Sequence, residues 1–446
     1  MALDQDYTIE LRTTGSDNNG GGFYNRDDGT SVDYSQQDAA QLNPTDLACT
    51  TGGATLTSAT GGFTAAMVGN LIQITAGTNF TAGFYEITGH TDTNTVTLDR
   101  DPTDGSNGSS GTGYVGGALA TPGKVGGLIA ALTGSFAHVY QATGTYILSS
   151  GSANVAGGKV DLPDGPCVTW VGYTAGSART TGESGWLAAK PEVNCGSQGS
   201  LTVFDCTGLY YARDHTFINI KVDANSQSSI YGFESDGGAE CHWVWCETVD
   251  CGCGFKYGAA IGCKATGGTY GFYGATGYLS QASGCTIGFR YGIFMCCLAY
   301  KCDGTSGFGV STCSGCVSVD NDGDGFSTSG NLCYGCIAAY NGGRGFDGHA
   351  SNISSIIHCA TIGNTSGAYN TGDAIVVTGL SELSADPFVD RASDDYRLNN
   401  VDGGGKDLRG QAGGVPPCHI DLGAAGQHKD PGFVAASVGR FGVMES

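Results

Sequence analysis

The sequence predicts an all-β protein, a right-handed parallel β-helix with a small β module inserted near the N-terminus and a C-terminal cap. Glycine accounts for 77 of the 446 residues, 40% are hydrophobic and only 14% are charged, which indicates a folded chain with many tight turns. The middle of the chain repeats a short pattern about every 20 residues. The segments between its glycines are short apolar alternations such as "CVSV" and "FINIKV", which are typical of strands.

The repeat is marked by Gly-Phe dipeptides. Their phenylalanines follow one another at separations of 22, 17, 17, 19, 18 and 20 residues and are Phe233, Phe255, Phe272, Phe289, Phe308, Phe326 and Phe346. Most units carry a cysteine about ten residues before the phenylalanine, and the unit of Cys285 fits this pattern less well. A repeat of this length accommodates three short strands and three bends, so equivalent cysteines, phenylalanines and small aliphatic residues should stack as ladders inside the coils.

Four segments are expected along the chain. Residues 1–35 predict an N-terminal strand and cap, and residues 36–118, with alternating strands and Gly or Asn turns, predict the inserted β-rich module. The parallel β-helix should occupy residues 119–380. Residues 381–446 break the repeat and are expected to cover the open end as a cap and tail, because an uncovered stack would expose strand edges.

The charge pattern excludes two classes of partner. The chain has 42 acidic and 20 basic residues, a net charge of −22, and no run of Lys or Arg, so we expect neither nucleic acid nor a membrane as partner. The N-terminal "MALDQDYTIELRTTG" lacks the basic and apolar regions of a signal peptide, which predicts synthesis and folding in a cytoplasm. In a reducing compartment, an odd total of 19 cysteines favours free thiols over a disulfide framework.

A family resemblance rests on four stretches. The opening "RTTGSDNNGG", the "ATGTYILSS" before the first coil, the Gly-Phe and Cys coils, and the closing "ADPFVDRASDDYRLNN…IDLGAAG" resemble the right-handed β-helix proteins of the pectate-lyase-like superfamily. That fold serves lyases, glycosidases, phage tailspikes and non-enzymatic virion proteins alike. The inserted module, the cysteine-rich core and the absence of a signal peptide look more like a tailed-phage virion protein. The resemblance implies a homotrimer attached to a capsid or tail.

Two CxxC pairs raise the question of zinc. Cys313/Cys316 and Cys333/Cys336 lie twenty residues apart, which elsewhere would be a strong zinc signal. Twenty is also the coil period, so the second pair should lie directly above the first, about 4.8 Å away. We therefore favour a structural thiol ladder, with zinc and a disulfide as alternatives, and we assign no metal ligand.

The stretch "DNDGDG" begins like a calcium loop. Counted from Asp320, however, the twelfth position is Asn331, where a bidentate Glu is expected, so the EF-hand pattern is incomplete. The next coil also replaces Asp320, Asp322 and Asp324 by Tyr340, Gly342 and Arg344. The residues that do recur in the next coil are those that the coil structure itself requires. A weak ion site in the turn is the alternative that stays open.

Carbohydrate cleavage would need a pair of carboxylates roughly 5 to 9.5 Å apart. The candidate acids on neighbouring coils are Glu234, Asp236, Glu240, Glu247 and Asp250, near Trp243 and Trp245, which could stack on sugar rings. Arg290 and Arg344 are the basic residues within the Gly-Phe coils. Asp214 and His215 are adjacent in sequence and should point to opposite faces of a strand, which disfavours a dyad. None of these residues sits in a diagnostic motif, so we assign no catalytic or cofactor-binding residue and expect no cofactor.

The leading hypothesis is a non-enzymatic structural protein of a phage virion, a rigid β-helix that decorates the capsid or forms a fibre or spike. Its partners would be other virion proteins and its own copies as a homotrimer. The alternatives are a tailspike-like depolymerase or lyase and a glycan-binding adhesin, both acting on a host surface polysaccharide. Carboxylate pairs would distinguish the enzyme from the adhesin.

Overall fold

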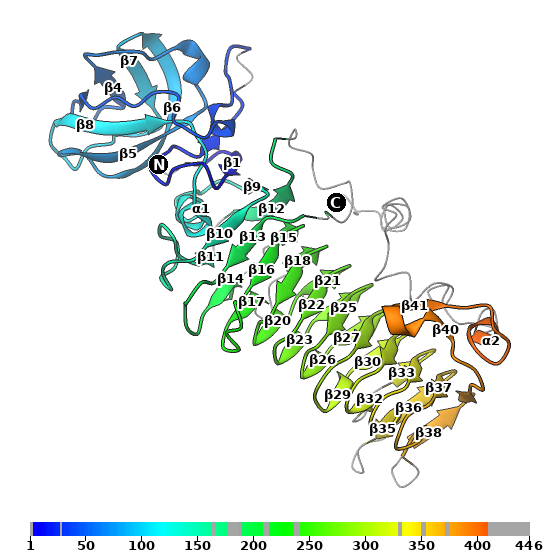
Figure 1. Ribbon diagram of the computed structural model, residues 1–446. Helices are drawn as coiled ribbons and strands as arrows, with labels where there is room; N and C mark the ends of the chain where they lie inside the picture. The colour runs from blue at the N-terminus through cyan, green and yellow to red at the C-terminus, as the bar shows by residue number, and fades with distance from the viewer. Residues whose placement is uncertain are drawn as a thin grey trace. The chain divides into compact units, whose positions relative to one another are not determined.

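The structure is a computed structural model. It describes residues 3–26, 29–162, 166–176, 187, 189–207, 214–235, 241–328, 332–348, 354–370 and 375–408. Its main body is a right-handed parallel β-helix, as predicted, in which successive coils add one strand to each of three sheets (Figure 1). By internal contacts the chain divides into two compact units, the first with the strands as far as β15 and the second with those from β16 onward.

The first sheet has 13 strands. Strand β2 pairs antiparallel with β1, and the described pairings that follow are parallel. In sheet order, its strands are β2 (Gly22–Phe23), β1 (Tyr7–Leu11), β9 (Phe136–Ala142), β12 (Cys167–Tyr173), β15 (His215–Ile218), β18 (Cys241–Val244), β21 (Ala259–Ile261), β24 (Thr276–Tyr278), β27 (Ile293–Met295), β30 (Thr312–Ser314), β33 (Leu332–Tyr334), β36 (Ser354–Ile357) and β38 (Ile375–Thr378).

The second and third sheets have 11 and 9 strands. The 11-stranded sheet consists of β10 (Thr145–Ile147), β13 (Glu192–Asn194), β16 (Lys221–Asp223), β19 (Glu247–Val249), β22 (Lys264–Thr266), β25 (Gln281–Ser283), β28 (Leu298–Tyr300), β31 (Val317–Val319), β34 (Ile337–Ala339), β37 (Ala360–Ile362) and β39 (Ser381–Glu382). The 9-stranded sheet consists of β11 (Val160–Asp161), β14 (Thr202–Cys206), β17 (Tyr231–Ser235), β20 (Cys253–Lys256), β23 (Tyr270–Tyr273), β26 (Ile287–Arg290), β29 (Ser306–Gly309), β32 (Asp324–Thr328) and β35 (Phe346–Gly348).

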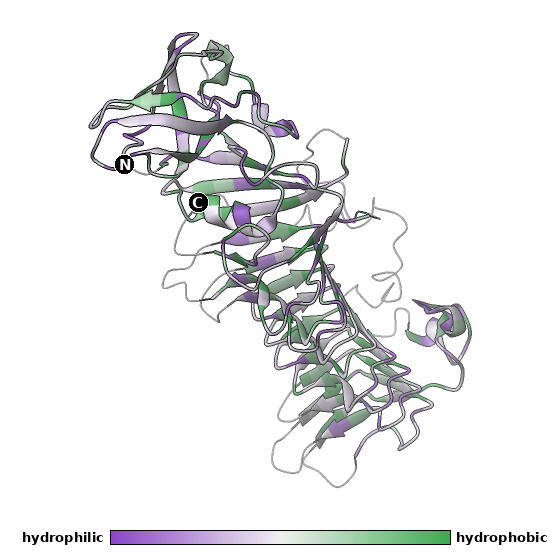
Figure 2. Cartoon of the chain, turned by 60° about the vertical axis from the view of Figure 1, so that its left-hand side comes forward, coloured by the Kyte–Doolittle hydropathy of each residue, from purple (hydrophilic) through white to green (hydrophobic). Residues whose placement is uncertain are grey.

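The repeated phenylalanines form one continuous stack in the interior of the coils. All seven are buried, and each is the register partner of the next in the 9-stranded sheet. Neighbouring rings lie 4.7 to 5.3 Å apart between centroids and within 11° of parallel. The Gly-Phe period in the sequence is therefore the period of the coil. Hydrophobic residues recur along the coil strands in Figure 2.

A second interior column is made of amides. Asn321 donates from Nδ2 to Oδ1 of Asn341, and Asn341 donates in the same way to Asn364, each at 2.8 Å. All three follow strands of the 11-stranded sheet. Cys302 precedes Asn321 in this column, because its backbone N–H donates to Oδ1 of Asn321 at 2.9 Å. A buried amide is tolerated here because its partner in the next coil satisfies it.

The inserted module is a closed six-stranded antiparallel barrel. Its strands, in barrel order, are β3 (Leu47–Cys49), β4 (Thr55–Ser58), β7 (Thr95–Leu98), β6 (Gly83–Asp92), β5 (Leu71–Thr78) and β8 (Gly108–Val115). A core of its own includes Leu56, Ile72 and Ile87, all fully buried. Closure leaves the barrel without free edges.

Helices are few. Helix α1 (Pro122–Ile129) lies between the barrel and the first coils in sequence, and the single turn α2 (Gly405–Leu408) comes near the end of the described chain. The described part of the chain also contains the short 3-10 turns η1 (Tyr34–Gln36), η2 (Ala65–Met67) and η3 (Arg391–Ser393). Among the described residues, no helix is long and apolar enough to cross a membrane.

The described part of the C-terminal segment packs on the side of the last coils. Hairpin strands β40 (Phe388–Asp390) and β41 (Asp395–Leu398) bring Phe388, Tyr396 and Leu398 against the outward side chains of the 11-stranded sheet, including Val319 and Ile337. Arg391 of η3 forms an ion pair with Asp320 at 2.7 Å. We expected residues 381–446 to cover the open end; residues 384–408 cover a side wall, because the outer face there is apolar, and residues 409–446 lie outside the described chain.

Candidate functional site

Tyrosine side chains gather on the outer surface of the second unit, where the 9-stranded sheet turns into the 13-stranded one. We call this cluster the tyrosine patch. It consists of Tyr231, Tyr257, Tyr270, Tyr273 and Tyr291 together with Glu234, Lys256 and Arg290. These side chains are half-buried or exposed, and 45% of Tyr291 is accessible to solvent.

The coil register places these residues side by side. Lys256, Tyr273 and Arg290 are successive register partners in β20, β23 and β26. Tyr257 and Tyr291 occupy the turns that follow β20 and β26, with φ of 59° and 57°. Gly274 holds the intervening turn, and a Cβ there would lie 2.5 Å from the ring of Tyr257, so only glycine leaves room for that ring.

Arg290 is held at the centre of the rings. It donates from one guanidinium nitrogen to the hydroxyl of Tyr270 at 2.8 Å and from the other to the hydroxyl of Tyr291 at 2.7 Å. Its Cζ lies 4.5 Å from the ring centroid of Tyr291, within the range of a cation–π contact. The ring of Tyr273 lies 5.2 Å from Tyr270 and 5.4 Å from Tyr291.

Lys256 and Glu234 form the other side of the patch. Lys256 Nζ lies 2.5 Å from the carboxylate of Glu234 and 4.8 Å from the ring centroid of Tyr231. Burial alone would lower the pKa of Lys256, but the hydrogen bond and charge of Glu234 outweigh it and raise the pKa, so the ammonium stays charged. Thr202 donates its hydroxyl to the same carboxylate at 2.7 Å.

The patch offers flat aromatic faces edged by fixed cations and hydroxyl groups. Such surfaces suit ligands that have one apolar face and several polar edges, because the rings bury the face while the donors bind the edge. A sugar ring has this character. A guanidinium also binds carboxylate groups in a bidentate manner, which would suit an acidic sugar.

The structure brings two of the sequence candidates into the patch, Glu234 and Arg290, and places others elsewhere. Trp243, which we expected as a surface for sugar stacking, is instead buried in the core beside Phe255, at 5.5 Å between ring centroids. Trp245 is only 8% exposed, in a turn with φ of 52°. Strand alternation turns Trp243 inward, and Gly262 packs against Trp245.

The remaining candidates are separated by the register. Glu247 lies between Lys221 and Lys264 in the 11-stranded sheet, and Arg344 forms an ion pair with Asp347 at 2.5 Å. Asp250 accepts a hydrogen bond from Ser226 at 3.2 Å. Asp236 and Glu240 lie outside the described residues.

Asp214 and His215 point to opposite sides, as alternation predicts. Asp214 is exposed, whereas His215 is fully buried and its Nδ1 accepts the backbone N–H of Val168 at 3.2 Å.

A carboxylate pair that the sequence analysis missed lies in the first unit. Asp161 and Asp205 are register partners in β11 and β14, and Lys159 binds Asp205 at 2.9 Å. Burial raises the pKa of Asp161, and the charge of Asp205 adds to this effect. Burial also acts to raise the pKa of Asp205, but hydrogen bonds from Thr207 and Lys159 outweigh it and lower the pKa. The signal was absent from the sequence because 43 residues separate the two acids.

The two CxxC pairs lie in neighbouring coils. Cys313 and Cys333 are register partners, and the thiol of Cys313 also contacts that of Cys316, just as Cys336 contacts Cys333. The sulfur of Cys316 lies 3.3 Å from the backbone carbonyl of Phe294. Burial acts to raise the pKa of the Cys316 thiol, but hydrogen bonds from Cys297, Cys313 and Cys336 outweigh it and lower that pKa. Within the described chain, no group of three or more His, Cys, Asp or Glu residues is placed to hold a metal ion.

The coil register explains why the repeat unit that contains Cys285 fits the cysteine pattern less well. The backbone N–H of Leu298 donates to the carbonyl of Ser280, just as that of Gln281 donates to Cys263, so Ser280 occupies the position that cysteine holds in the neighbouring coils. Cys285 belongs to the turn after β25 instead.

The aspartates of "DNDGDG" do not converge. Asp320 binds Arg391 of the C-terminal hairpin, and Asp324 accepts the backbone N–H of Arg344 at 2.7 Å. Asp322 lies in the turn between them and is exposed.

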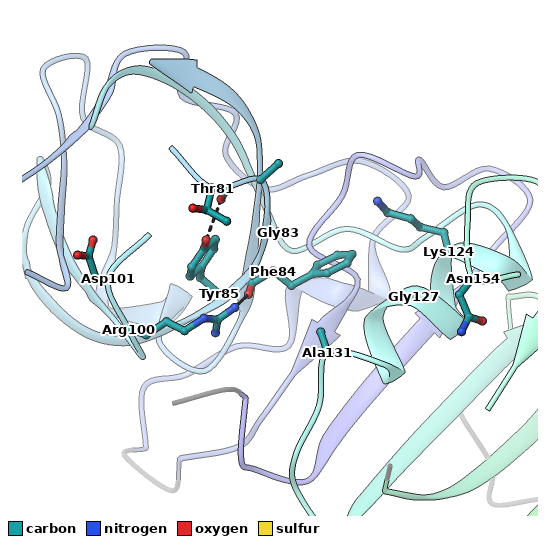
Figure 3. A pocket seen from close by; sticks show the side chains of 11 residues that line it. Thr81, Gly83, Phe84, Tyr85, Arg100, Asp101, Lys124, Gly127, Ala131 and Asn154 are labelled. Carbon is teal, nitrogen blue, oxygen red and sulfur yellow. Dashed lines mark hydrogen bonds between the residues drawn. The ribbon is translucent and has the colours of Figure 1, made fainter. Parts of the chain in front are cut away.

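A pocket of about 460 Å³ lies in the first unit, between strand β6 and helix α1 (Figure 3). Its polar groups are engaged in internal contacts: Arg100 lies 4.2 Å from the ring centroid of Tyr85, whose hydroxyl donates to Thr81 O. Lys124 lies 5.1 Å from the ring of Phe84 across the pocket. The contact of Lys124 with Phe84 joins α1 to the barrel, and the polar groups named here already have partners within the protein, so the tyrosine patch is the stronger candidate for a ligand site.

The comparisons with known proteins find solved structures of low similarity only. No protein-family model and no curated protein sequence matches this chain. Among solved structures, the A-module of mannuronan C-5 epimerase AlgE4 from Azotobacter vinelandii is 14% identical, with a TM-score of 0.37, over 55% of this chain and 86% of that one. The catalytic unit of the GH87 alpha-1,3-glucanase from Streptomyces thermodiastaticus is 10% identical, with a TM-score of 0.26, over 85% and 97%. The fold assignment rests on the strand register of this chain itself.

Proposed function

We propose that the protein is a stiff β-helical surface protein that binds a polysaccharide through the tyrosine patch. The observation that carries the proposal is the arrangement of Tyr270, Tyr273 and Tyr291 around the fixed guanidinium of Arg290. The interior phenylalanine and asparagine columns support a rigid body, because each coil is bonded to the next along its length. Together with the sequence resemblance, this fits a phage virion component, a fibre, spike or capsid decoration.

Binding to immobilised neutral and acidic polysaccharides tests the proposal. Tyr273→Ala and Arg290→Ala should each weaken binding about tenfold or more, since a lost ring or charged contact of about 1.4 kcal/mol corresponds to a factor of ten. Tyr278→Ala is the matched control, because Tyr278 lies on the outer face of the 13-stranded sheet. Equal binding by all four proteins, or binding by none, would contradict the proposal.

The enzymatic alternative is favoured by one observation, the register pair Asp161 and Asp205. Neighbouring strands lie about 4.8 Å apart, which is close to the carboxylate separation of retaining glycosidases. The opposite directions of their pKa shifts suit an acid and an ionised partner. Shortening of a bound polysaccharide by the wild type, abolished in Asp161→Asn and Asp205→Asn, would establish this alternative; unchanged polymer length would exclude it.

A further inference from the structure

In the second unit, the outward positions of the 13-stranded sheet carry no charged side chain, although the chain as a whole is acidic. In the second unit the sheet comprises the eight strands β18, β21, β24, β27, β30, β33, β36 and β38, and each has two outward positions, sixteen in all. None of the sixteen is Asp, Glu, Lys or Arg. We call this surface the uncharged face.

Hydrophobic side chains run along the uncharged face in two rows. Ile261, Met295 and Ile357 belong to one row, and Ile293, Leu332 and Val376 belong to the other. Ile293 is 54% exposed and Val376 is 51% exposed. Serine, threonine, tyrosine and one histidine, His242, occupy most of the other positions.

The 11-stranded sheet offers a comparison, because part of its outer surface is also apolar. The 11-stranded sheet also turns apolar over its last coils, at Leu298, Val317 and Ile337, and there the C-terminal hairpin covers it. Over its earlier coils, where no described segment covers it, the same sheet presents Lys221, Glu247 and Lys264. No described segment of the chain packs on Ile293 or Leu332 as the hairpin does on Val317.

We propose that the uncharged face is where two copies of this chain associate. With a net charge of −22 on each copy, approach through any charged surface is opposed, and this face is the one along which repulsion is weakest. Both copies also repeat at the same coil spacing, so the rows of one copy match the rows of the other along their whole length. A partner of different structure would not share this period.

The size of the face predicts a weak association. Eight strands about 4.8 Å apart and about 10 Å wide present roughly 400 Å² on each copy, at the small end of protein interfaces. The association should therefore be seen at about 10 to 100 μM, and it should strengthen between about 0.05 and 0.5 M salt, because salt screens the repulsion between the acidic copies. An interface made of ion pairs would weaken instead.

Sedimentation velocity of the full chain across this concentration range tests the proposal. The double variant Ile293→Glu with Leu332→Glu places like charges on both copies and should weaken association at least tenfold. Ser327→Glu with Ser381→Glu adds the same charge on the other two sheets and should leave it unchanged. The milder pair Ile293→Thr with Leu332→Thr serves if the Glu variant does not fold, and should weaken association by a smaller factor.

Three outcomes would overturn the proposal. One is a wild type that stays monomeric at about 100 μM in about 0.5 M salt. Another is association that both Glu variants weaken equally. The third is association that falls as salt rises. Thermal unfolding of each variant, compared with the wild type, separates loss of association from loss of fold.

Discussion

At the scale of single residues, stacking along the coil axis decides where side chains go. Phe289 lies 4.7 Å from Phe272 on one side and 4.7 Å from Phe308 on the other, with ring planes within 7° of parallel. Phe294, from the 13-stranded sheet, contacts its edge at 4.8 Å. A phenylalanine in this position is therefore enclosed by aromatic carbon, and its removal cannot be compensated by a neighbour on one side alone.

Phe289→Ala should lower the free energy of unfolding by about 3 to 5 kcal/mol, since the cavity lies inside a fixed stack. Phe289→Leu keeps much of the volume and should cost less. Urea unfolding followed by tryptophan fluorescence measures both. Tyr273→Ala removes a ring of similar size from the surface and should change stability by less than about 1 kcal/mol. Equal effects of Phe289→Ala and Tyr273→Ala would show that the stack is not a stabilising core.

The Asp205 carboxylate couples stability to pH. Its pKa is lowered in the folded chain: burial opposes ionisation, but the hydrogen bonds from Thr207 and Lys159 outweigh it. A lowered pKa contributes stability that is present above the ordinary aspartate pKa and is lost as pH falls through the folded value. Asp205→Asn should therefore be less stable than wild type at pH 7, by about 1.5 to 3 kcal/mol for charged hydrogen bonds.

The difference between wild type and Asp205→Asn should shrink as the pH falls below about 4, where Asp205 of the unfolded chain takes up its proton, and should vanish once the pH is below the lowered pKa of the folded chain. Urea unfolding at several pH values measures it. Asp214→Asn is the control, because Asp214 is exposed. A difference that stays constant down to acid pH would contradict the assignment of the hydrogen bonds.

At the scale of elements, the sequence predicts the coils better than it predicts what covers them. The Gly-Phe period places β17, β20 and β23 in register, since one inward residue per coil is enough to set the repeat. The hairpin β40–β41 lies outside that period. Its docking depends on outward residues such as Val317 and Ile337. Strand alternation alone predicts that such residues face solvent, and it gives no sign that another segment covers them.

The hairpin should detach locally when Arg391 is replaced. Arg391 joins Asp320 at 2.7 Å and lies 3.7 Å from the ring centroid of Tyr340, so Arg391→Gln removes an ion pair and a cation–π contact. The expected loss is about 1 to 2 kcal/mol of docking free energy. Hydrogen exchange should become faster in β41 and stay unchanged in β20.

Arg344→Gln is the matched control for the hairpin. Arg344 pairs with Asp347 of its own coil, so its replacement should leave exchange in β41 unchanged. Faster exchange throughout the coils in Arg391→Gln would mean that the hairpin is part of the global fold rather than a docked element.

The sequence predicted only part of the candidate site, because the coil repeat identifies inward residues and does not show which outward residues meet. Arg290 and Glu234 were visible as charged residues in an otherwise apolar repeat. The tyrosines were not, because Tyr257 and Tyr291 sit in turns whose outward direction depends on a positive φ that no motif announces. Spacing did hold a signal: Tyr257, Gly274 and Tyr291 recur at the coil period with a glycine between two rings.

At the scale of the whole molecule, the cysteines are distributed along the interior rather than gathered at one site. None of the 18 cysteines in the described residues is in a disulfide, and among them Cys167 is the one that is not buried. Burial raises the pKa of the Cys253 thiol to about 12, and that of the Cys263 thiol well above its ordinary value. Thiols in this state are neutral at pH 7, and a neutral thiol is a poor nucleophile.

The native protein should therefore react slowly with a thiol reagent at nearly all of its 19 cysteines. After unfolding in denaturant without reductant, all 19 should react, because a chain without disulfides exposes every thiol at once. Since one stack of coils buries most of these thiols, the reaction rates of the coil cysteines in the native protein should rise together near the unfolding transition, whereas Cys49 belongs to the barrel. Fewer than 19 reactive thiols in the unfolded chain would reveal disulfides or bound metal, and early reaction of Cys313 and Cys333 alone would show that the coils open locally there.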